Sequence, residues 1–406
     1  MNKHIRVTLL FLIMSFVSSA QKIATFEIEI PASTNGSDIP VSIELDKYTS
    51  LPASSLILNE INGNTITPVS IQIDNRAMYW IIRNGNKKKH SYQLTKGSPG
   101  KFDEIQLDNK NGSLTARYGS QNLLRYQFET VYPPAGIDTN YKRSAFIHPL
   151  WTPHGQELTR IQPPDHYHHY GIWNPWTHTL FENDTIDFWN IKGKKGTVRF
   201  AKFNSIVNGP VYAEFEALHE HVVFKKDGSE KIALNELQKI RVYQPAAKSD
   251  HYIVDITSTM TCGTESPLLL LTYRYGGLGW RATEAWDKTN CEVLTSEGKT
   301  RKDTDGSKAR WCIVQGNLNN DYGGAVLMSY PANYNHPEPL RIWDENANGG
   351  RGDMFANFSP TKDKDWLLEP GKTYVLKYRL VVFNGKFDAG KAENGWQYFA
   401  EPVKAK

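Results

Sequence analysis

Histidines and tryptophans gather in one stretch of the sequence, residues 143–189. Six of the twelve histidines fall in it, together with four of the eleven tryptophans. Proline and glycine interrupt the stretch repeatedly, which predicts a loop-rich segment and not a long helix or strand. Histidine acts as an acid, a base or a metal ligand near neutral pH, and functional side chains often lie on loops. We therefore expect the chemistry of the protein to lie here.

The densest part of this stretch reads D-H-Y-H-H-Y-G and begins at Asp165. On a strand, His166 and His168 would face one way and Asp165 and His169 the other, whereas a loop could bring all three imidazoles together. Two interpretations remain open. The histidines could bind a divalent metal, with Asp165 as a ligand or as a partner of one. Alternatively, one histidine is a general base or acid and another holds an anionic substrate. The spacing does not decide between them, so no metal is assigned.

A second stretch, residues 273–286, reads Y-R-Y-G-G-L-G-W-R-A-T-E-A-W. The apolar run before it predicts a strand over 267–275 that is buried on both faces, ending in a glycine-rich bend. Arg274 on such a strand requires an anionic partner. That partner could be a structural carboxylate, such as Glu284 or Asp255, or a carboxylate or sulfate of a substrate held bidentately.

The candidate catalytic residues come from both stretches. The tyrosines that flank Arg274 could transfer a proton if a neighbouring arginine lowers the pKa of the phenol. The candidate catalytic set is therefore His166, His168, His169, Tyr273 and Tyr275. The candidate substrate-binding set is Arg143, His148, Trp173, Arg274, Trp280, Arg281 and Glu284.

A third stretch, residues 330–358, contains Arg341, Trp343 and Asp344, followed by N-A-N-G-G-R-G-D. The glycines and asparagines predict a loop at the rim of the fold, where a carboxylate could face a groove. The triplet Arg351-Gly352-Asp353 matches an integrin-binding motif and is interpreted as a coincidence.

Composition and termini limit the class of protein. The chain has 406 residues and a formal net charge of +4, with no basic block, so nucleic acid is not an expected partner. Residues 1–20 carry a basic start, a short apolar run and small residues before Gln21, which predicts a signal peptide and an exported, periplasmic protein. No later run predicts a membrane span. The three cysteines allow at most one internal disulfide, and buried free thiols are expected. The oligomeric state is left open.

The remaining sequence predicts an all-β fold. Short alternating runs separated by turns predict a small β-sandwich accessory domain over 21–115, and longer alternating runs predict antiparallel strands over 116–406. These include 113–118, 196–207, 211–223, 232–243, 252–261, 311–316 and 374–383; a short helix is expected over 389–399. Two large sheets packed face to face would form a catalytic β-sandwich with a concave face suited to a glycan.

The motifs I-H-P-L-W-T-P-H-G, P-P-D-H-Y-H-H-Y-G-I-W and D-F-W resemble a bacterial exported family of unknown function that carries the label methane oxygenase PmoA-like. The resemblance covers most of residues 120–385 and implies a carbohydrate ligand without a particular reaction. The last strand, L-E-P-G-K-T-Y-V-L-K-Y-R-L, looks like that of the galactose-mutarotase-like supersandwich, which implies a sugar-active scaffold.

These observations predict a carbon–oxygen lyase that acts on acidic oligosaccharides during polysaccharide degradation. Elimination at a uronate needs a base, a cation that binds the carboxylate and an acid that protonates the leaving oxygen, and the candidate residues include all three types. A loop-closed pocket favours chain ends, so we expect a dehydratase or exo-lyase that forms a 4,5-unsaturated uronate at the non-reducing end. A glycoside hydrolase, with carboxylates such as Asp165, Glu284, Asp344 or Glu345, or a sugar epimerase is the first alternative. A noncatalytic glycan-binding protein is the second.

Overall fold

The computed structural model describes residues 21–30, 38–83 and 88–403. The predicted signal peptide lies outside these ranges. The described chain is built from antiparallel strands, as expected for an all-β protein. Its α-helices are the short turn α1 (Ala347–Gly350) and the C-terminal α2 (Ala389–Ala400), the latter at the place that the sequence predicts. Three 3-10 turns span Leu45–Lys47, Ala53–Ser55 and Thr139–Tyr141.

The N-terminal part forms two small sheets with a core of their own. Alternating apolar side chains face this core, which includes the fully buried Phe26 and Trp80. The four-stranded sheet has the order β1 (Lys22–Glu29), β7 (Lys89–Lys96), β3 (Leu56–Asn62) and β4 (Thr65–Val69). The three-stranded sheet has the order β2 (Ile39–Glu44), β6 (Ala77–Ile82) and β5 (Gln72–Asp74).

Two large sheets make up the rest of the fold. The nine-stranded sheet has the order β22 (Lys308–Ala309), β25 (Glu338–Ile342), β26 (Phe355–Phe358), β20 (Gly279–Arg281), β12 (Ile172–Trp173), β11 (Phe146–Leu150), β10 (Gln121–Gln127), β9 (Ser113–Tyr118) and β8 (Ile105–Lys110). The eight-stranded sheet has the order β15 (Gly196–Val207), β16 (Tyr212–Phe224), β17 (Glu230–Tyr243), β18 (His251–Cys262), β28 (Tyr374–Asn384), β24 (Asp321–Ser329), β23 (Trp311–Leu318) and β21 (Cys291–Thr295). A small sheet of β14 (Asp184–Ile186), β13 (Thr179–Phe181), β19 (Leu268–Leu270) and β27 (Trp366–Leu368) flanks them.

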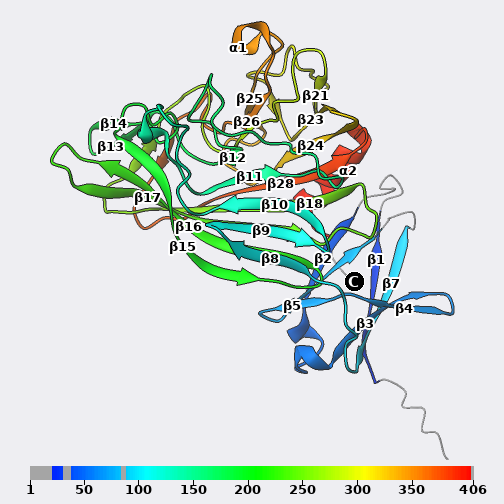
Figure 1. Cartoon of the computed structure of the whole chain (residues 1–406). Coiled ribbons are helices and arrows are strands. Elements are labelled where there is room, and N and C mark those ends of the chain that lie inside the picture. Colours follow the sequence, from blue (N-terminus) through cyan, green and yellow to red (C-terminus); the bar gives the residue numbers. More distant parts are fainter. Residues whose placement is uncertain (1–20, 31–37, 84–87, 404–406) are drawn as a thin grey trace, which may run out of the picture.

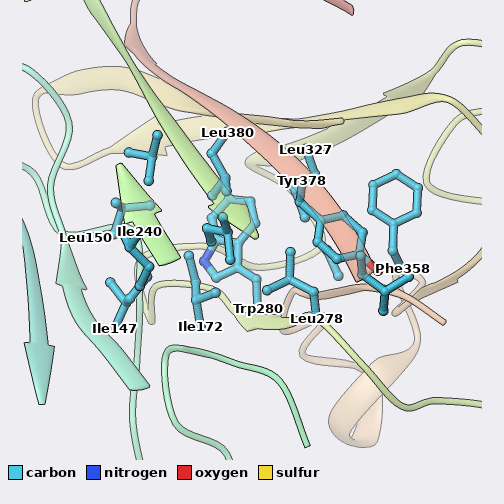
Figure 2. Packing of buried hydrophobic residues seen from close by; sticks show 14 of the residues in the cluster. Ile147, Leu150, Ile172, Ile240, Leu278, Trp280, Leu327, Phe358, Tyr378 and Leu380 are labelled. Carbon is cyan, nitrogen blue, oxygen red and sulfur yellow. The ribbon is translucent and has the colours of Figure 1, made fainter. Parts of the chain in front are cut away.

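The main hydrophobic core lies between the two large sheets. Figure 2 shows Ile147 and Trp280 of the nine-stranded sheet packed toward Ile240, Leu327 and Leu380 of the eight-stranded sheet. These side chains are almost completely buried. Their burial stabilises the sandwich, because each fully buried aliphatic or aromatic side chain contributes roughly 1.5–3 kcal/mol relative to exposure. The prediction of a large antiparallel β-sandwich with a small N-terminal β unit is therefore confirmed.

The sequence pattern located most of the long strands. The predicted strands over 113–118 and 196–207 coincide with β9 and β15. The predicted strand over 267–275 is wrong, because β19 spans only Leu268–Leu270 and the chain then leaves the sheet. Thr272 turns away from the sheet, since its N–H and hydroxyl both donate to Asp365 Oδ1 at 2.6 Å. Arg274 consequently lies on an exposed loop and not on a buried strand.

The predicted domain boundary at residue 115 remains a prediction. β8, which precedes that boundary, already pairs with β9 in the nine-stranded sheet. α2 packs near both parts of the chain, because Phe399 joins a core cluster beside the eight-stranded sheet and Tyr398 packs against the N-terminal core. Figure 1 shows the N-terminal strands and the rim turn α1 on opposite sides of the sandwich.

Two further expectations concern cysteines and membrane spans. Cys262, Cys291 and Cys312 are free thiols, and the last two are buried. Within residues 21–30, 38–83 and 88–403, we find no helix with the length and apolar character needed to cross a bilayer.

Candidate functional site

A pocket of about 330 Å³ opens among the loops around β12, β20, β25 and β26. Figure 1 places β12, β25 and β26 on the same side of the sandwich as α1. The lining of the pocket includes residues from three separate stretches of the sequence: 143–189, 273–286 and 330–358. We call the part of the last stretch that borders the pocket the rim loop. Its lining residues are His166, His168, His169, Trp189, Arg274, Tyr275, Asp305, Arg341, Ile342, Trp343, Asp344, Asn346, Ala347, Asn348 and Phe355.

The histidines reach this pocket because the chain turns tightly at P-P-D-H-Y-H-H. The His166 N–H donates to the carbonyl of Pro163 at 2.9 Å, and the His169 N–H donates to the carbonyl of His166 at 3.0 Å. These turns break the alternation of a strand, so His166, His168 and His169 converge. Their ring centroids lie 4.6–5.3 Å apart. We call these three residues the pocket histidine cluster.

Asp165 orients the first histidine of the cluster. Its Oδ2 lies 2.7 Å from His166 Nδ1, and Arg281 Nη2 lies 2.9 Å from the same oxygen. Burial alone would raise the pKa of Asp165, but the hydrogen bond from His166 and the charge of Arg281 lower it to about 2. An ionised Asp165 can only accept, so Nδ1 of His166 carries a proton, and in the neutral form of the ring Nε2 has the lone pair. A carboxylate–histidine pair of this kind suits either a general base or a metal ligand.

Arg281 also fixes the third histidine. Its Nη1 lies 3.5 Å from His169 Nδ1, and a guanidinium can only donate. His169 therefore accepts at Nδ1 and carries its proton on Nε2. Burial, with the charges of His168 and Arg281, holds the pKa of His169 well below its usual value. Burial and the charge of His166 similarly lower the pKa of His168 to about 3, so both rings are neutral near pH 7.

Arg274 and Tyr275 form the neighbouring part of the pocket. The guanidinium of Arg274 lies over the rings of Tyr273 and Tyr275, 5.7 and 5.4 Å from the centroids. The hydroxyl of Tyr275 donates to Asn190 Oδ1 at 3.0 Å. Burial raises the pKa of Tyr275 to about 12 and outweighs the lowering by the charge of Arg274, so the condition set for Tyr275 as a base is not met. Tyr275 is therefore protonated at neutral pH and is suited to donate a proton.

The two structural carboxylates considered for Arg274 pair with other residues. Glu284 accepts from Arg160 Nη2 at 2.9 Å, and Asp255 accepts from Arg379 at 2.7 and 2.8 Å. Among the ion pairs of residues 21–30, 38–83 and 88–403, none involves Arg274. Its exposed guanidinium is therefore available to an anionic ligand at the pocket.

Several candidate substrate contacts lie in the interior. Arg143 is buried and donates to the carbonyls of Phe188 and Trp189 at 2.8 and 3.0 Å. It therefore holds the backbone at Trp189, which lines the pocket. Trp173 is buried against His169, with ring centroids 5.2 Å apart. Trp280 is buried and donates to the carbonyl of Leu158 at 2.8 Å. Their apolar surroundings place them in the core, so the structure corrects their expected role as sugar contacts.

The other candidates either are buried next to the pocket residues or lie outside the pocket. Arg281 is buried and acts through Asp165 and His169 without lining the pocket. His148 bonds to Thr159 Oγ1 at 2.9 Å outside the pocket. Glu284 is exposed outside it, and Tyr273 lies on a shallow surface next to it. The burial of Arg281 therefore opposes a direct substrate contact, whereas the substrate-binding roles of His148 and Glu284 remain predictions.

The rim loop supplies pocket residues that the candidate sets omitted. Arg341 Nη1 donates to Asp305 Oδ2 at 2.6 Å, and both side chains line the pocket. Asp344 lines it as an exposed carboxylate, in agreement with the expectation for the third stretch. Trp343 packs against His166, with ring centroids 4.9 Å apart. The cluster R-I-W-D was visible in the sequence, whereas nothing local distinguishes Asp305.

The Arg351-Gly352-Asp353 triplet is structural. Asp353 is buried and accepts from Arg281 Nη2 at 2.9 Å, while Asn348 and Arg351 contact the same carboxylate. The Asp353 carboxylate therefore connects the rim loop to Arg281. The burial of Asp353 agrees with the interpretation of the triplet as a coincidental match to the integrin-binding motif.

The chain belongs to a family of unknown function, DUF6807. The family model matches residues 113–397, which include every pocket residue. Its description names no reaction and carries no methane oxygenase label. No curated protein matches the chain.

Among solved structures, the chain is similar to a double variant of the GH36 α-galactosidase AgaA from Geobacillus stearothermophilus in complex with raffinose. The identity is 10% and the TM-score 0.32, over 72% of this chain and 42% of the other. The chain thus spans less than half the length of that enzyme, and a likeness this distant does not bear on the reaction.

Proposed function

We propose that the pocket binds the terminal uronate of an acidic oligosaccharide and removes the substituent at C4 by elimination. The observation that carries the proposal is the placement of an aspartate-backed histidine, His166, in one pocket with Arg274, a cation that has no carboxylate partner among the described residues. Elimination needs both a base for the C5 proton and a cation for the carboxylate next to it.

His166 is the best base among the three histidines. Its Nδ1 proton is held by Asp165, and the ionised carboxylate stabilises the imidazolium that forms when Nε2 takes a proton. His168 and His169 are weaker bases, because burial lowers the pKa of each ring. His169 instead offers its Nε2 proton as a hydrogen-bond donor.

The reaction then divides among three side chains. His166 Nε2 takes the C5 proton, and the electron pair of the C5–H bond becomes the second bond between C4 and C5. The C4–O bond breaks with its electron pair on oxygen, and this oxygen takes a proton from Tyr275. Arg274 neutralises the carboxylate as its charge spreads. The proton gained by His166 balances the proton lost by Tyr275, so water leaves from a terminal residue, or a sugar alcohol leaves from an internal linkage.

Hydrolysis is less well supported by the pocket. A glycosidase needs a carboxylic acid that remains protonated near neutral pH. The pKa of Asp165 is lowered to about 2, so it is ionised. Burial raises the pKa of Glu338 to about 7, but its carboxylate bonds to Ser329, Asn333 and Tyr378 and lies outside the pocket.

The deciding experiment is incubation of the protein with a panel of uronate oligosaccharides, read by mass and ultraviolet absorbance. An uncleaved chain that loses the mass of one water and gains absorbance supports a dehydratase; cleavage with the same absorbance supports a lyase. Fragments that together gain one water, or a product of unchanged mass, would replace elimination with hydrolysis or epimerisation. Binding without turnover would support a noncatalytic protein.

The roles are tested with two matched substitutions. His166→Ala should lower kcat/KM by about 100-fold or more, the usual contribution of a general base. His154→Ala is the control, because His154 also pairs with an aspartate, Asp321, at 2.9 Å, but on the surface. Equal activity of both variants would exclude His166 as the base.

A divalent metal is a second role for the pocket histidine cluster. Three ligand nitrogens, one from each histidine, lie within 4.8 Å of one another, and Asp165 would orient His166 as a carboxylate orients a metal ligand. The contact of Arg281 with His169 Nδ1 opposes this role, because it uses one lone pair and adds positive charge. Elemental analysis of the purified protein decides between the two roles. One equivalent of bound metal in the wild-type protein that is lost in His168→Ala supports a metal site, whereas no bound metal in the wild-type protein supports acid–base use.

A further inference from the structure

A shallow depression adjoins the pocket and shares one residue with it. It is lined by Thr272, Tyr273, Arg274 and Lys362, and Arg274 also lines the pocket. We call these four residues the cationic ledge. Since a guanidinium presents five N–H donors in a planar fork, Arg274 can face ligands in both spaces.

The ledge and the adjoining rim carry more cations than carboxylates. Lys362 Nζ lies 3.2 Å from the carbonyl oxygen of Arg274 and 3.2 Å from Asp305 Oδ1. Asp305 also accepts from Arg341 at 2.6 Å, so Lys362 and Arg341 share this one carboxylate, and Arg274 pairs with no carboxylate among the described residues. Lys362 is only 15% exposed, which fixes its ammonium near the other two. Burial, and the nearby charges of Arg341 and Arg274, lower the pKa of Lys362.

The other carboxylates near the ledge are already bonded. Asp365 Oδ1 accepts from both the N–H and the hydroxyl of Thr272. Asp363 accepts from Asn335 at 2.6 Å and pairs with Lys308 at 3.1 Å. Neither lines the depression. An anion placed between Arg274 and Lys362 would therefore meet two cationic donors and a local excess of positive charge.

We propose that the substrate carries a second anionic group, a sulfate ester or a carboxylate on the sugar next to the terminal uronate, and that Arg274 and Lys362 bind it on the cationic ledge. This inference rests on the proposed function for the position of the terminal uronate. The charge of the ledge itself is independent of the reaction. The aromatic face of Tyr273, beside Arg274, offers that second sugar an apolar surface.

Binding of defined disaccharides tests the ledge. The probes are glucuronyl-N-acetylgalactosamine and its 6-sulfated form, measured by titration calorimetry; digalacturonate against galacturonate tests the carboxylate source. The sulfated or doubly carboxylated probe should bind about tenfold more tightly than its partner. Lys362→Met should remove this advantage, whereas Lys364→Met, which alters an exposed lysine over Tyr334, should keep it. Equal affinities within both probe pairs for the wild-type protein, or an advantage that survives Lys362→Met, would overturn the inference.

Inorganic sulfate separates failure of the ledge from failure of the proposed function. Sulfate should raise the Tm of the wild-type protein and of Lys364→Met more than that of Lys362→Met. If no disaccharide binds while the sulfate effect depends on Lys362, the ledge stands and the uronate pocket fails. If the sulfate effect does not depend on Lys362, the ledge fails, whatever the pocket binds.

Discussion

In the part of the chain that the structure describes, two groups of histidines are paired with carboxylates; one group lines the pocket and the other is buried. The pocket histidine cluster lines a cavity, and Asp165 holds His166 from behind. The second group, which we call the core network, comprises His219, His221 and Glu236 on β16 and β17, all almost completely buried.

In the core network, the carboxylate of Glu236 accepts hydrogen bonds from residues on both sides of the sandwich. Glu236 Oε1 accepts from Asn174 at 2.6 Å and from Ser258 at 2.7 Å, while Oε2 lies 3.2 Å from His221 Nε2. Burial alone would raise the pKa of Glu236, but the hydrogen bonds of His219 and His221 lower it well below its usual value. His219 Nε2 is bonded to the hydroxyl of Tyr126 at 2.6 Å.

The difference shows that residue types do not decide between structure and chemistry. Both groups pair imidazole with an ionised carboxylate. The core network is buried in the interior of the sandwich, where its hydrogen bonds hold the sheets together. The pocket histidine cluster leaves Nε2 of His166 for a ligand. The following predictions test this contrast.

The largest effect should come from Glu236→Gln. The change removes the charge that His219 and His221 face in the interior, and breaking such a buried group costs about 3 kcal/mol. Chemical denaturation measures the free energy of unfolding. Glu230→Gln is the control, because Glu230 pairs with Arg199 on the surface and should change stability by less than about 0.5 kcal/mol. Similar values for both variants would mean that the core network is not structural.

A smaller loss should follow Arg281→Gln. This arginine is buried between Asp165 and Asp353, so its removal takes one buried cation from each carboxylate, while Asp165 keeps its contact with His166 and Asp353 keeps its contact with Arg351. We expect a loss of about 2 kcal/mol in the free energy of unfolding, less than the full cost of a buried pair because Asp165 is partly exposed. Arg160→Gln, which breaks the surface pair with Glu284, should be nearly neutral. A neutral Arg281→Gln would mean that the pocket does not need its support.

Acidification should weaken folding through His168. In the unfolded chain this residue binds a proton near its ordinary pKa of 6.5, whereas in the folded protein its pKa is about 3. The unfolded state therefore binds more protons between these values, and the free energy of unfolding falls as the pH falls. The His168 contribution is about 1 kcal/mol between pH 7 and pH 5, after discounting for partial exposure. His168→Gln should flatten the measured pH dependence; an unchanged slope would contradict the lowered pKa.

The smallest change in stability should follow His166→Asn, because its side chain is 34% exposed. We expect less than about 0.5 kcal/mol. Chemical modification distinguishes the two groups more directly than stability does. Diethyl pyrocarbonate should modify His166 in the native protein and leave His219 and His221 unmodified, as read by mass spectrometry. Modification of the core histidines under native conditions would remove the contrast between the two groups.

The sequence alone determined the fold class and much of the site. Alternation with period two predicted β9 and β15 at their observed bounds, because each long strand has one face toward the core. Proline and glycine predicted a loop-rich segment around Asp165, and the convergence of the three histidines, which the sequence left open, is shown by the structure. The same alternation along β16 places His219 and His221 on the face of Phe215, a signal that could have revealed the core network.

Only the tertiary structure decided which of these side chains line the pocket. Trp173, Trp280 and Arg143 have the residue types of a sugar site, yet packing of the sheets buries them, and burial depends on contacts distant in sequence. Arg274 was expected on a buried strand, but the hydrogen bonds of Thr272 with Asp365 end the sheet and expose it. Asp305 joins the pocket through Arg341, and no local pattern could reveal a partner separated by 36 positions. Local pattern fixes the direction of a side chain, whereas long-range packing fixes whether water and substrate can reach it.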